Sequence, residues 1–116
     1  MTRTEIRVIK GWADALRHGH VRQAVAYFRL PAQVSAGQQP IELTTRAQLR
    51  LFNSSLPCGA KLERTQRQPR GYVLATFRLT ERPGRGRCGD GTGHRARTLF
   101  YIEHGEIVQW FRATDP

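Results

Sequence analysis

The chain has 116 residues, of which 39% are apolar and 24% are charged. That length suits a single domain, residues 1–116, and the apolar fraction lies well above that of disordered chains. No apolar run approaches the ~20 residues of a membrane span and no signal peptide is visible, so we expect a cytoplasmic protein without a membrane partner. The formal net charge of +10 implies affinity for polyanions at low salt.

Two helices are predicted at the start of the chain. The run Thr2-Arg3-Thr4-Glu5 matches a capping box, and apolar residues follow it at helical spacing until Gly19, which should close the first helix. Asp14 falls on the opposite, solvent-facing side of this helix. A second helix should begin after His20 as its cap and end at Pro31, because proline cannot continue a helix.

A short β-ribbon and a third helix follow. Residues 32–43 contain two short extended runs around a turn that includes Gly37 and Pro40. The run Thr45-Arg46-Ala47-Gln48 is a second capping box, so the third helix should open there and stop before Pro57.

The second half of the chain has the alternating pattern of strands. We expect strands at residues 60–64, 71–82, 95–103 and 106–112, with a glycine-rich loop at 83–93. Three helices placed before a run of antiparallel strands predict an α+β fold in which the helices pack on one face of the sheet.

The two cysteines, Cys58 and Cys88, are expected to be free thiols if the protein is cytoplasmic. Adjacent strands could still bring them together, so a disulfide is the alternative. Their spacing fits no zinc motif, and we expect neither a metal nor a cofactor.

Three further patterns have ordinary explanations. The run Gly84 to Gly89 spells GxGxxG. The dinucleotide-binding fingerprint requires a helix after this motif, but a strand is predicted there instead. The glycosylation sequon Asn53-Ser54-Ser55 lies in a predicted helix. Many arginines gather between residues 64 and 97, but exposed aromatic residues do not alternate with them and no recognition helix is present. We therefore interpret them as a solvated surface, with a nucleic-acid patch as the alternative.

Four stretches carry a resemblance to a known superfamily. They are residues 12–20, 24–28, 45–52 and 100–110, which include Trp12-Ala13-Asp14-Ala15-Leu16 and the hairpin Phe100 to Trp110. In this order and spacing they resemble the nuclear transport factor 2-like superfamily, in particular its SnoaL-like and ketosteroid-isomerase-like branches. His20 departs from the pattern, because the family usually has an aspartate there.

The resemblance implies a cone-shaped fold. In such a cone, three N-terminal helices pack on a strongly curved antiparallel sheet around an internal pocket that opens at the wide end. Many members of the superfamily form homodimers through the outer face of the sheet, so we expect a homodimer of that kind here.

The same resemblance argues against two reactions of the fold. Aligned on these stretches, the oxyanion tyrosine of the isomerases falls on Trp12, their proton-shuttle aspartate on Ala36 and their oxyanion aspartate on Thr98. Neither alanine nor threonine can act as a base near neutral pH. The last aspartate of limonene-epoxide-hydrolase-like members falls on Arg112, which cannot accept a proton from water.

Six residues are expected to surround the pocket, with ordinary core packing as the alternative for the aromatic ones: Trp12, Phe77, Thr98, Phe100, Trp110 and Arg112. An inward-pointing Arg112 would require an anion, because an uncompensated buried charge is costly. We therefore expect a protein that binds a small apolar or anionic molecule, as a SnoaL-like cyclase, isomerase or hydrolase with a non-standard site would. The alternatives are, second, a non-catalytic interaction or dimerisation domain and, third, a basic nucleic-acid-binding module.

Overall fold

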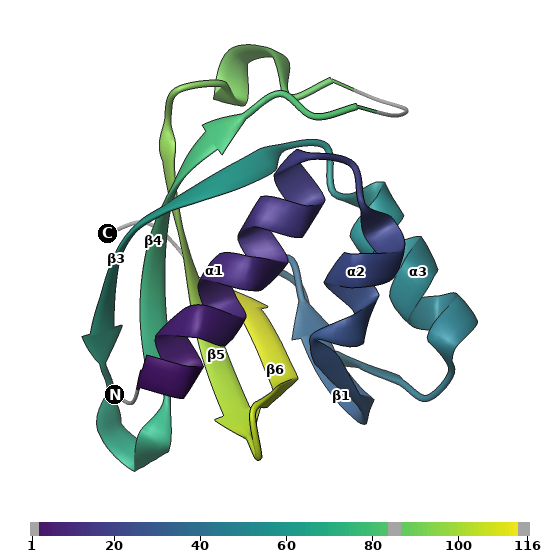
Figure 1. Ribbon diagram of the computed structural model, residues 1–116, viewed down its shortest axis with the longest axis vertical. Coiled ribbons are helices and arrows are strands. Elements are labelled where there is room, and N and C mark those ends of the chain that lie inside the picture. Colours follow the sequence, from purple (N-terminus) through teal and green to yellow (C-terminus); the bar gives the residue numbers. More distant parts are fainter. Residues whose placement is uncertain (1–2, 84–86, 114–116) are drawn as a thin grey trace.

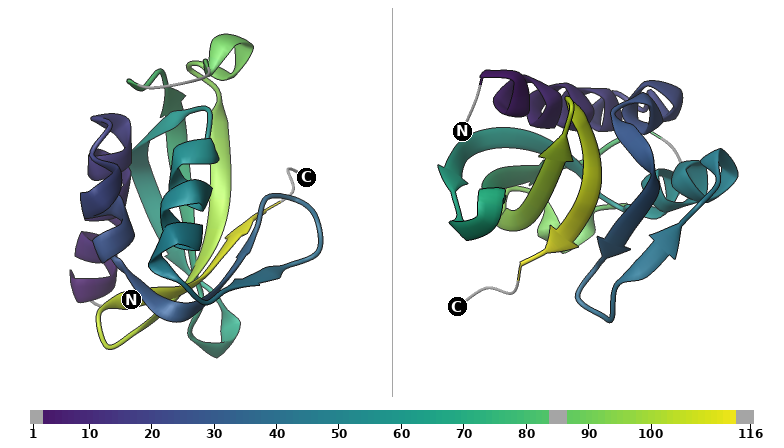
Figure 2. Two further views of the ribbon diagram at one scale, coloured as in Figure 1. Left: turned by 90° about the vertical axis from the view of Figure 1, so that its right-hand side faces the viewer. Right: turned by 90° about the horizontal axis from the view of Figure 1, so that it is seen from below.

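The computed structural model describes residues 3–83 and 87–113, which form three helices and six strands (Figure 1). The helices are α1 (Arg3–Arg17), α2 (Val21–Ala26) and α3 (Arg46–Ser55). The strands are β1 (Phe28–Ser35), β2 (Ile41–Leu43), β3 (Gly59–Arg67), β4 (Val73–Thr80), β5 (Arg95–Glu103) and β6 (Glu106–Arg112). Figure 2 shows the sheet curving around the side on which α1 lies, so the α+β fold with a curved sheet is confirmed.

The strands form one sheet in the order β2-β1-β6-β5-β4-β3. Consecutive strands from β3 to β6 pair antiparallel, as do β1 and β2, but β1 pairs with β6 in parallel. The sheet is therefore mostly antiparallel, as expected, and β1 with β6 is its parallel pair. The meander starts at the far edge of the sheet, at β3, and its last strand reaches β1 running in the same direction as β1.

Helix α1 buries one stripe of its surface and exposes the other. The buried stripe includes Ile9, Trp12 and Leu16. On the other side, Asp14 forms ion pairs with Lys10 at 2.8 Å and Arg17 at 2.7 Å. Burial raises the pKa of Asp14, but the hydrogen bonds from Lys10 and Arg17 outweigh it and leave that pKa below its usual value. Asp14 therefore lies on the solvent-facing side of the helix, as predicted, and is held there by two ion pairs.

Helix α2 is shorter than predicted. It ends at Ala26, and Phe28 already begins β1, where it pairs with Ile107 of β6. Pro31 therefore lies within a strand rather than at the end of a helix. The apolar spacing that favours a helix at Phe28 is also compatible with a strand, and the pairing with β6 decides between the two. His20 occupies the N-cap position as expected, but its side chain makes no capping hydrogen bond.

Helix α3 begins at the predicted capping box. The hydroxyl of Thr45 accepts a hydrogen bond from the backbone N–H of Gln48 at 3.1 Å, and the side-chain oxygen of Gln48 accepts one from the backbone N–H of Thr45 at 3.1 Å. The helix ends at Ser55, before Pro57. The first predicted capping box includes Thr2, and the GxGxxG run includes residues 84–86, so both lie partly outside the described residues.

The structure joins Cys58 and Cys88 in a disulfide, so the expectation of free thiols is wrong. The two residues are 30 apart in sequence, but the loop between β4 and β5 folds back to the start of β3. Glu81 helps to hold this loop, because its carboxylate accepts hydrogen bonds from the backbone N–H groups of Cys88 at 3.0 Å and Gly89 at 3.1 Å.

The described part of the chain contains neither a cluster of metal-ligating side chains nor a helix that could span a membrane. Within residues 3–83 and 87–113, no group of three or more His, Cys, Asp or Glu side chains could hold a metal ion. Over the same ranges, no helix combines the length and apolar character needed to cross a membrane.

Candidate functional site

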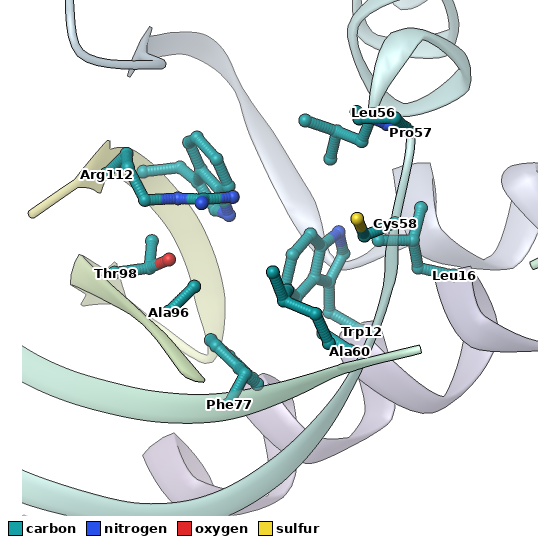
Figure 3. A pocket seen from close by; sticks show the side chains of 12 residues that line it. Trp12, Leu16, Leu56, Pro57, Cys58, Ala60, Phe77, Ala96, Thr98 and Arg112 are labelled. Atoms are coloured by element: carbon teal, nitrogen blue, oxygen red, sulfur yellow. The ribbon is translucent and has the colours of Figure 1, made fainter. Parts of the chain in front are cut away.

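A cavity of about 80 Å³ lies between α1, the junction of α3 with β3, and the inward face of β4, β5 and β6 (Figure 3). Its wall is mostly apolar. The lining residues are Trp12, Leu16, Leu56, Pro57, Cys58, Ala60, Phe77, Leu79, Ala96, Thr98, Trp110 and Arg112. The volume is smaller than that of an engineered apolar cavity of about 150 Å³ that binds benzene. A compact molecule, or one end of a longer one, fits this space.

Five of the six residues expected around a pocket line this cavity, and Phe100 does not. Phe100 is fully buried behind the wall, where its ring packs edge-on against Trp12 at 5.8 Å and against Phe77 at 6.1 Å. Its place is in the core that supports the cavity. The alternation along β5 explains why Thr98 and Phe100 face the same side, but it does not tell which of them reaches the cavity.

The two indoles of the chain meet at this site. The rings of Trp12 on α1 and Trp110 on β6 lie 6.1 Å apart, centre to centre, in an edge-to-face arrangement. Both side chains are buried, with 2% and 1% of their surface exposed. The first helix and the final hairpin therefore contribute to one common interior, which is the geometry that the pocket hypothesis requires.

Asn53 supports the cavity wall from behind, through Trp12, and is a residue that the sequence analysis missed. It is fully buried, and its side-chain oxygen accepts a hydrogen bond from Trp12 Nε1 at 2.9 Å. Its amide group donates to the carbonyl of Leu49 at 2.9 Å. The indole N–H of Trp12 is thus already occupied and does not serve a ligand. The signal was the position of Asn53 four residues after Leu49, on the inward side of α3.

Arg112 brings a positive charge to the cavity wall. Its guanidinium lies 5.6 Å from the ring centre of Trp110, within the range of a cation–π contact. Figure 3 shows the side chain reaching into the cavity from β6, on the side opposite Leu56 and Cys58. The polar part of the wall is therefore gathered on β5 and β6, around Thr98, Trp110 and Arg112.

The cavity wall carries no obvious acid or base. Among the described residues that line it there is no Asp, Glu or His. Ala36, which aligns with the proton-shuttle aspartate of the isomerases, is exposed in the turn between β1 and β2 and does not line the cavity. The wall can orient a molecule and donate hydrogen bonds to it, but none of these described side chains can remove a proton near neutral pH.

Several arginines of the basic region make contacts within the fold. Arg82 donates to the backbone carbonyls of Asn53 at 2.8 Å and Leu56 at 3.0 Å, at the end of α3, and burial lowers its pKa. Arg78 and Arg95 both form ion pairs with Glu63, at 3.0 and 2.7 Å. These contacts favour a structural role for part of the region over a nucleic-acid patch.

A wider groove of about 550 Å³ lies elsewhere, on the surface between β2 and α3. Its lining includes Ile41 and Leu51, which are 59% and 72% exposed, together with Phe52. None of its lining residues is charged. The groove is more open than the smaller cavity, which is lined by buried aromatic rings together with Thr98 and Arg112, so the cavity is the better candidate site.

No protein-family model matches this chain, and no curated protein matches it in sequence. Solved structures do. An NTF2-like protein of unknown function from Cytophaga hutchinsonii is 13% identical, with a TM-score of 0.71, over 100% of this chain and 93% of that one. An uncharacterised cystatin-fold protein from Novosphingobium aromaticivorans is 17% identical, with a TM-score of 0.65, over 98% of this chain and 99% of that one.

A third similar structure is an LEH-like epoxide hydrolase from Mycobacterium tuberculosis, which is 18% identical, with a TM-score of 0.66, over 98% of this chain and 80% of that one. At such low identity these similarities concern the fold alone. They confirm the nuclear transport factor 2-like fold that the resemblance implied.

Proposed function

We propose that this protein binds a small, mainly apolar molecule in the cavity between Trp12 and Trp110. The observation that carries the proposal is the arrangement of the wall: two buried indoles meet in one interior, with a hydroxyl and a guanidinium beside them. Apolar walls with a few grouped polar side chains are typical of small-molecule sites. The ligand is apolar or anionic, and Arg112 favours the anionic kind.

A cavity-filling substitution tests this proposal. Ala96 lines the cavity, and Ala96→Leu should fill much of it. Ala26→Leu makes the same chemical change at an exposed position of α2 and is the matched control. We expect compounds from a panel of small acids, ketones and hydrocarbons to raise the melting temperature of the natural protein and of Ala26→Leu, but not of Ala96→Leu. A panel without a single binder, or binding that survives in Ala96→Leu, would refute the proposal.

Any chemistry at this site would be of a non-standard kind. We propose binding without catalysis ahead of a cyclase, isomerase or hydrolase activity. The reason is that the described wall offers hydrogen-bond donors and a positive charge but no side chain that can act as a base. Such groups can stabilise an oxyanion that develops on a bound substrate. The isomerase and epoxide-hydrolase mechanisms need a carboxylate at Ala36 or Arg112 and are not proposed.

The second candidate is a dimerisation or interaction domain that uses the outer face of the sheet. A row of apolar side chains favours it: Leu74, Leu99 and Phe111 are paired across β4, β5 and β6 and are only partly exposed. Light scattering measures the oligomeric state directly. We expect a dimer that Leu99→Glu converts to a monomer, and a natural protein that is monomeric at high concentration would exclude this candidate.

We also propose a cytoplasmic location for the protein, although a disulfide is unusual for proteins of that compartment.

A further inference from the structure

The buried indole N–H of Trp110, beside the cavity, has no hydrogen-bond partner within the described residues. Trp110 is 1% exposed, and no residue in the ranges 3–83 and 87–113 accepts a hydrogen bond from its Nε1. The indole of Trp12 differs in this respect, because Asn53 accepts its hydrogen bond. Buried donors are almost always paired in folded proteins, so an unpartnered one calls for an explanation. An atom bound in the cavity that Trp110 lines would supply the missing acceptor.

The side chains of the wall are rich in donors and poor in acceptors. Trp110 can only donate, and so can the guanidinium of Arg112, whereas the hydroxyl of Thr98 can donate or accept. No Asp, Glu, Asn, Gln or His side chain is present among the described lining residues. A ligand whose polar end is itself a donor, such as an amine, would therefore find few partners. A ligand with an acceptor oxygen matches the wall.

The size of the cavity limits the remainder of the ligand. With about 80 Å³ available, the enclosed part is smaller than benzene, on the order of five non-hydrogen atoms. Residues such as Leu16, Ala60 and Phe77 surround it, so this part is apolar.

We propose that the ligand presents a carbonyl or carboxylate oxygen that accepts a hydrogen bond from Trp110 Nε1, with a short apolar body in the cavity. This inference rests on the proposed function, because it requires that the cavity takes a ligand. It assigns Trp110 as the residue that selects the ligand, through its N–H group. Ketones and short carboxylic acids share the required acceptor, and the experiment separates the two.

Three probes of equal non-hydrogen atom count test the selection: cyclobutanone, propionate and cyclopentane. The chain has two tryptophans, so the ¹⁵N-labelled protein has two indole N–H signals in its NMR spectrum. We expect cyclobutanone, propionate or both to shift the Trp110 signal downfield, while cyclopentane shifts it little. The Trp12 signal should move less, because Asn53 keeps its hydrogen bond. A ketone response alone identifies a neutral carbonyl ligand, and a propionate response alone identifies an acid.

Two variants remove the donor. Trp110→Phe assigns the signal and deletes the N–H, and replacement of Trp110 by benzothienylalanine deletes it while keeping a bicyclic ring of similar size. Because one hydrogen bond is lost, we expect the preference for the acceptor probe over cyclopentane to fall about five- to tenfold in the benzothienylalanine protein. Tyr72→Phe is the control, because it removes a hydrogen-bond donor from a residue that does not line the cavity, and it should keep the preference.

The results separate this inference from the proposed function. If cyclopentane binds as tightly as the acceptor probes, or if the benzothienylalanine protein keeps the preference, the cavity binds ligands but Trp110 does not select them. If none of the probes and no compound of the larger panel binds, the proposed function fails and the inference fails with it.

Discussion

Trp12 on α1 donates its indole N–H to the side-chain oxygen of Asn53 on α3, at 2.9 Å and out of contact with water. Asn53 in turn donates to the carbonyl of Leu49 at 2.9 Å, one turn earlier in its own helix. The two helices are therefore joined by a polar bond inside an apolar core. This bond fixes the plane of an indole that forms one wall of the cavity.

Replacing Asn53 should destabilise the fold strongly. In Asn53→Leu the indole N–H of Trp12 has no acceptor, and a buried unsatisfied donor costs about 1–3 kcal/mol. We expect the free energy of unfolding in urea to fall by roughly that amount. In a Trp12→Phe background the same substitution should cost less, because the donor is absent. Equal losses in the two backgrounds would show that the hydrogen bond does not stabilise the fold.

Arg82 should contribute to stability through the end of α3. Its guanidinium donates to the carbonyls of Asn53 and Leu56, which helps to satisfy backbone groups at the helix C-terminus. We expect Arg82→Ala to lower the free energy of unfolding by about 1–2 kcal/mol. Arg22→Ala removes the same charge from an exposed position of α2 and should change stability little. If the two variants lose equally, net charge rather than capping is responsible.

The disulfide between Cys58 and Cys88 should also be a large source of stability. For a sequence separation of 30 residues, the loss of chain entropy in the unfolded state corresponds to about 3–4 kcal/mol. We expect reduction, or the double substitution Cys58→Ser and Cys88→Ser, to lower the free energy of unfolding by up to this amount. A thiol assay on the protein unfolded without reductant checks the bond itself, and two free thiols would contradict it.

The loss of stability at acidic pH should depend on Glu81. Backbone N–H groups of Cys88 and Gly89 donate to its carboxylate, and they hold its pKa below the ordinary value of 4.5. A carboxyl whose pKa is lowered by folding stabilises the protein above pH 4.5, and this contribution is lost as the pH falls through the lower folded value.

We therefore expect Glu81→Gln to weaken the dependence of unfolding free energy on pH below 4.5. Glu103→Gln, which removes the same charge at the exposed end of β5, is the control. A Glu81→Gln protein with the acid sensitivity of the natural one would rule out this role. Urea denaturation at a series of pH values measures the effect.

Local patterns were sufficient for much of the fold. The strand-like patterns of residues 95–103 and 106–112 predicted β5 and β6 with their observed bounds, and the pair Thr45 and Gln48 predicted the start of α3. The end of α2 was predicted wrongly, because Phe28 suits a helical stripe as well as a strand. Its pairing with Ile107, from the far end of the chain, decides the outcome, and no local pattern contains that information.

The candidate site was predicted less completely, for the same reason. Residues on regular elements, such as Trp12 and Trp110, could be placed inward from their periodicity and from the resemblance. The bond from Asn53 to Trp12 and the link between Cys58 and Cys88 depend on how distant segments meet. A polar residue in a helix suggests a solvent position by default, so the sequence pattern does not predict that Asn53 is buried.

The meeting of the two indoles has a practical consequence. Because the chain contains no tryptophan besides Trp12 and Trp110, its whole tryptophan fluorescence originates at the wall of one cavity. The two indole rings lie 6.1 Å apart, centre to centre, so excitation energy absorbed by one is readily transferred to the other. A molecule that enters this space alters the surroundings of both tryptophans. Its binding can therefore be followed through the intrinsic fluorescence of the unlabelled protein.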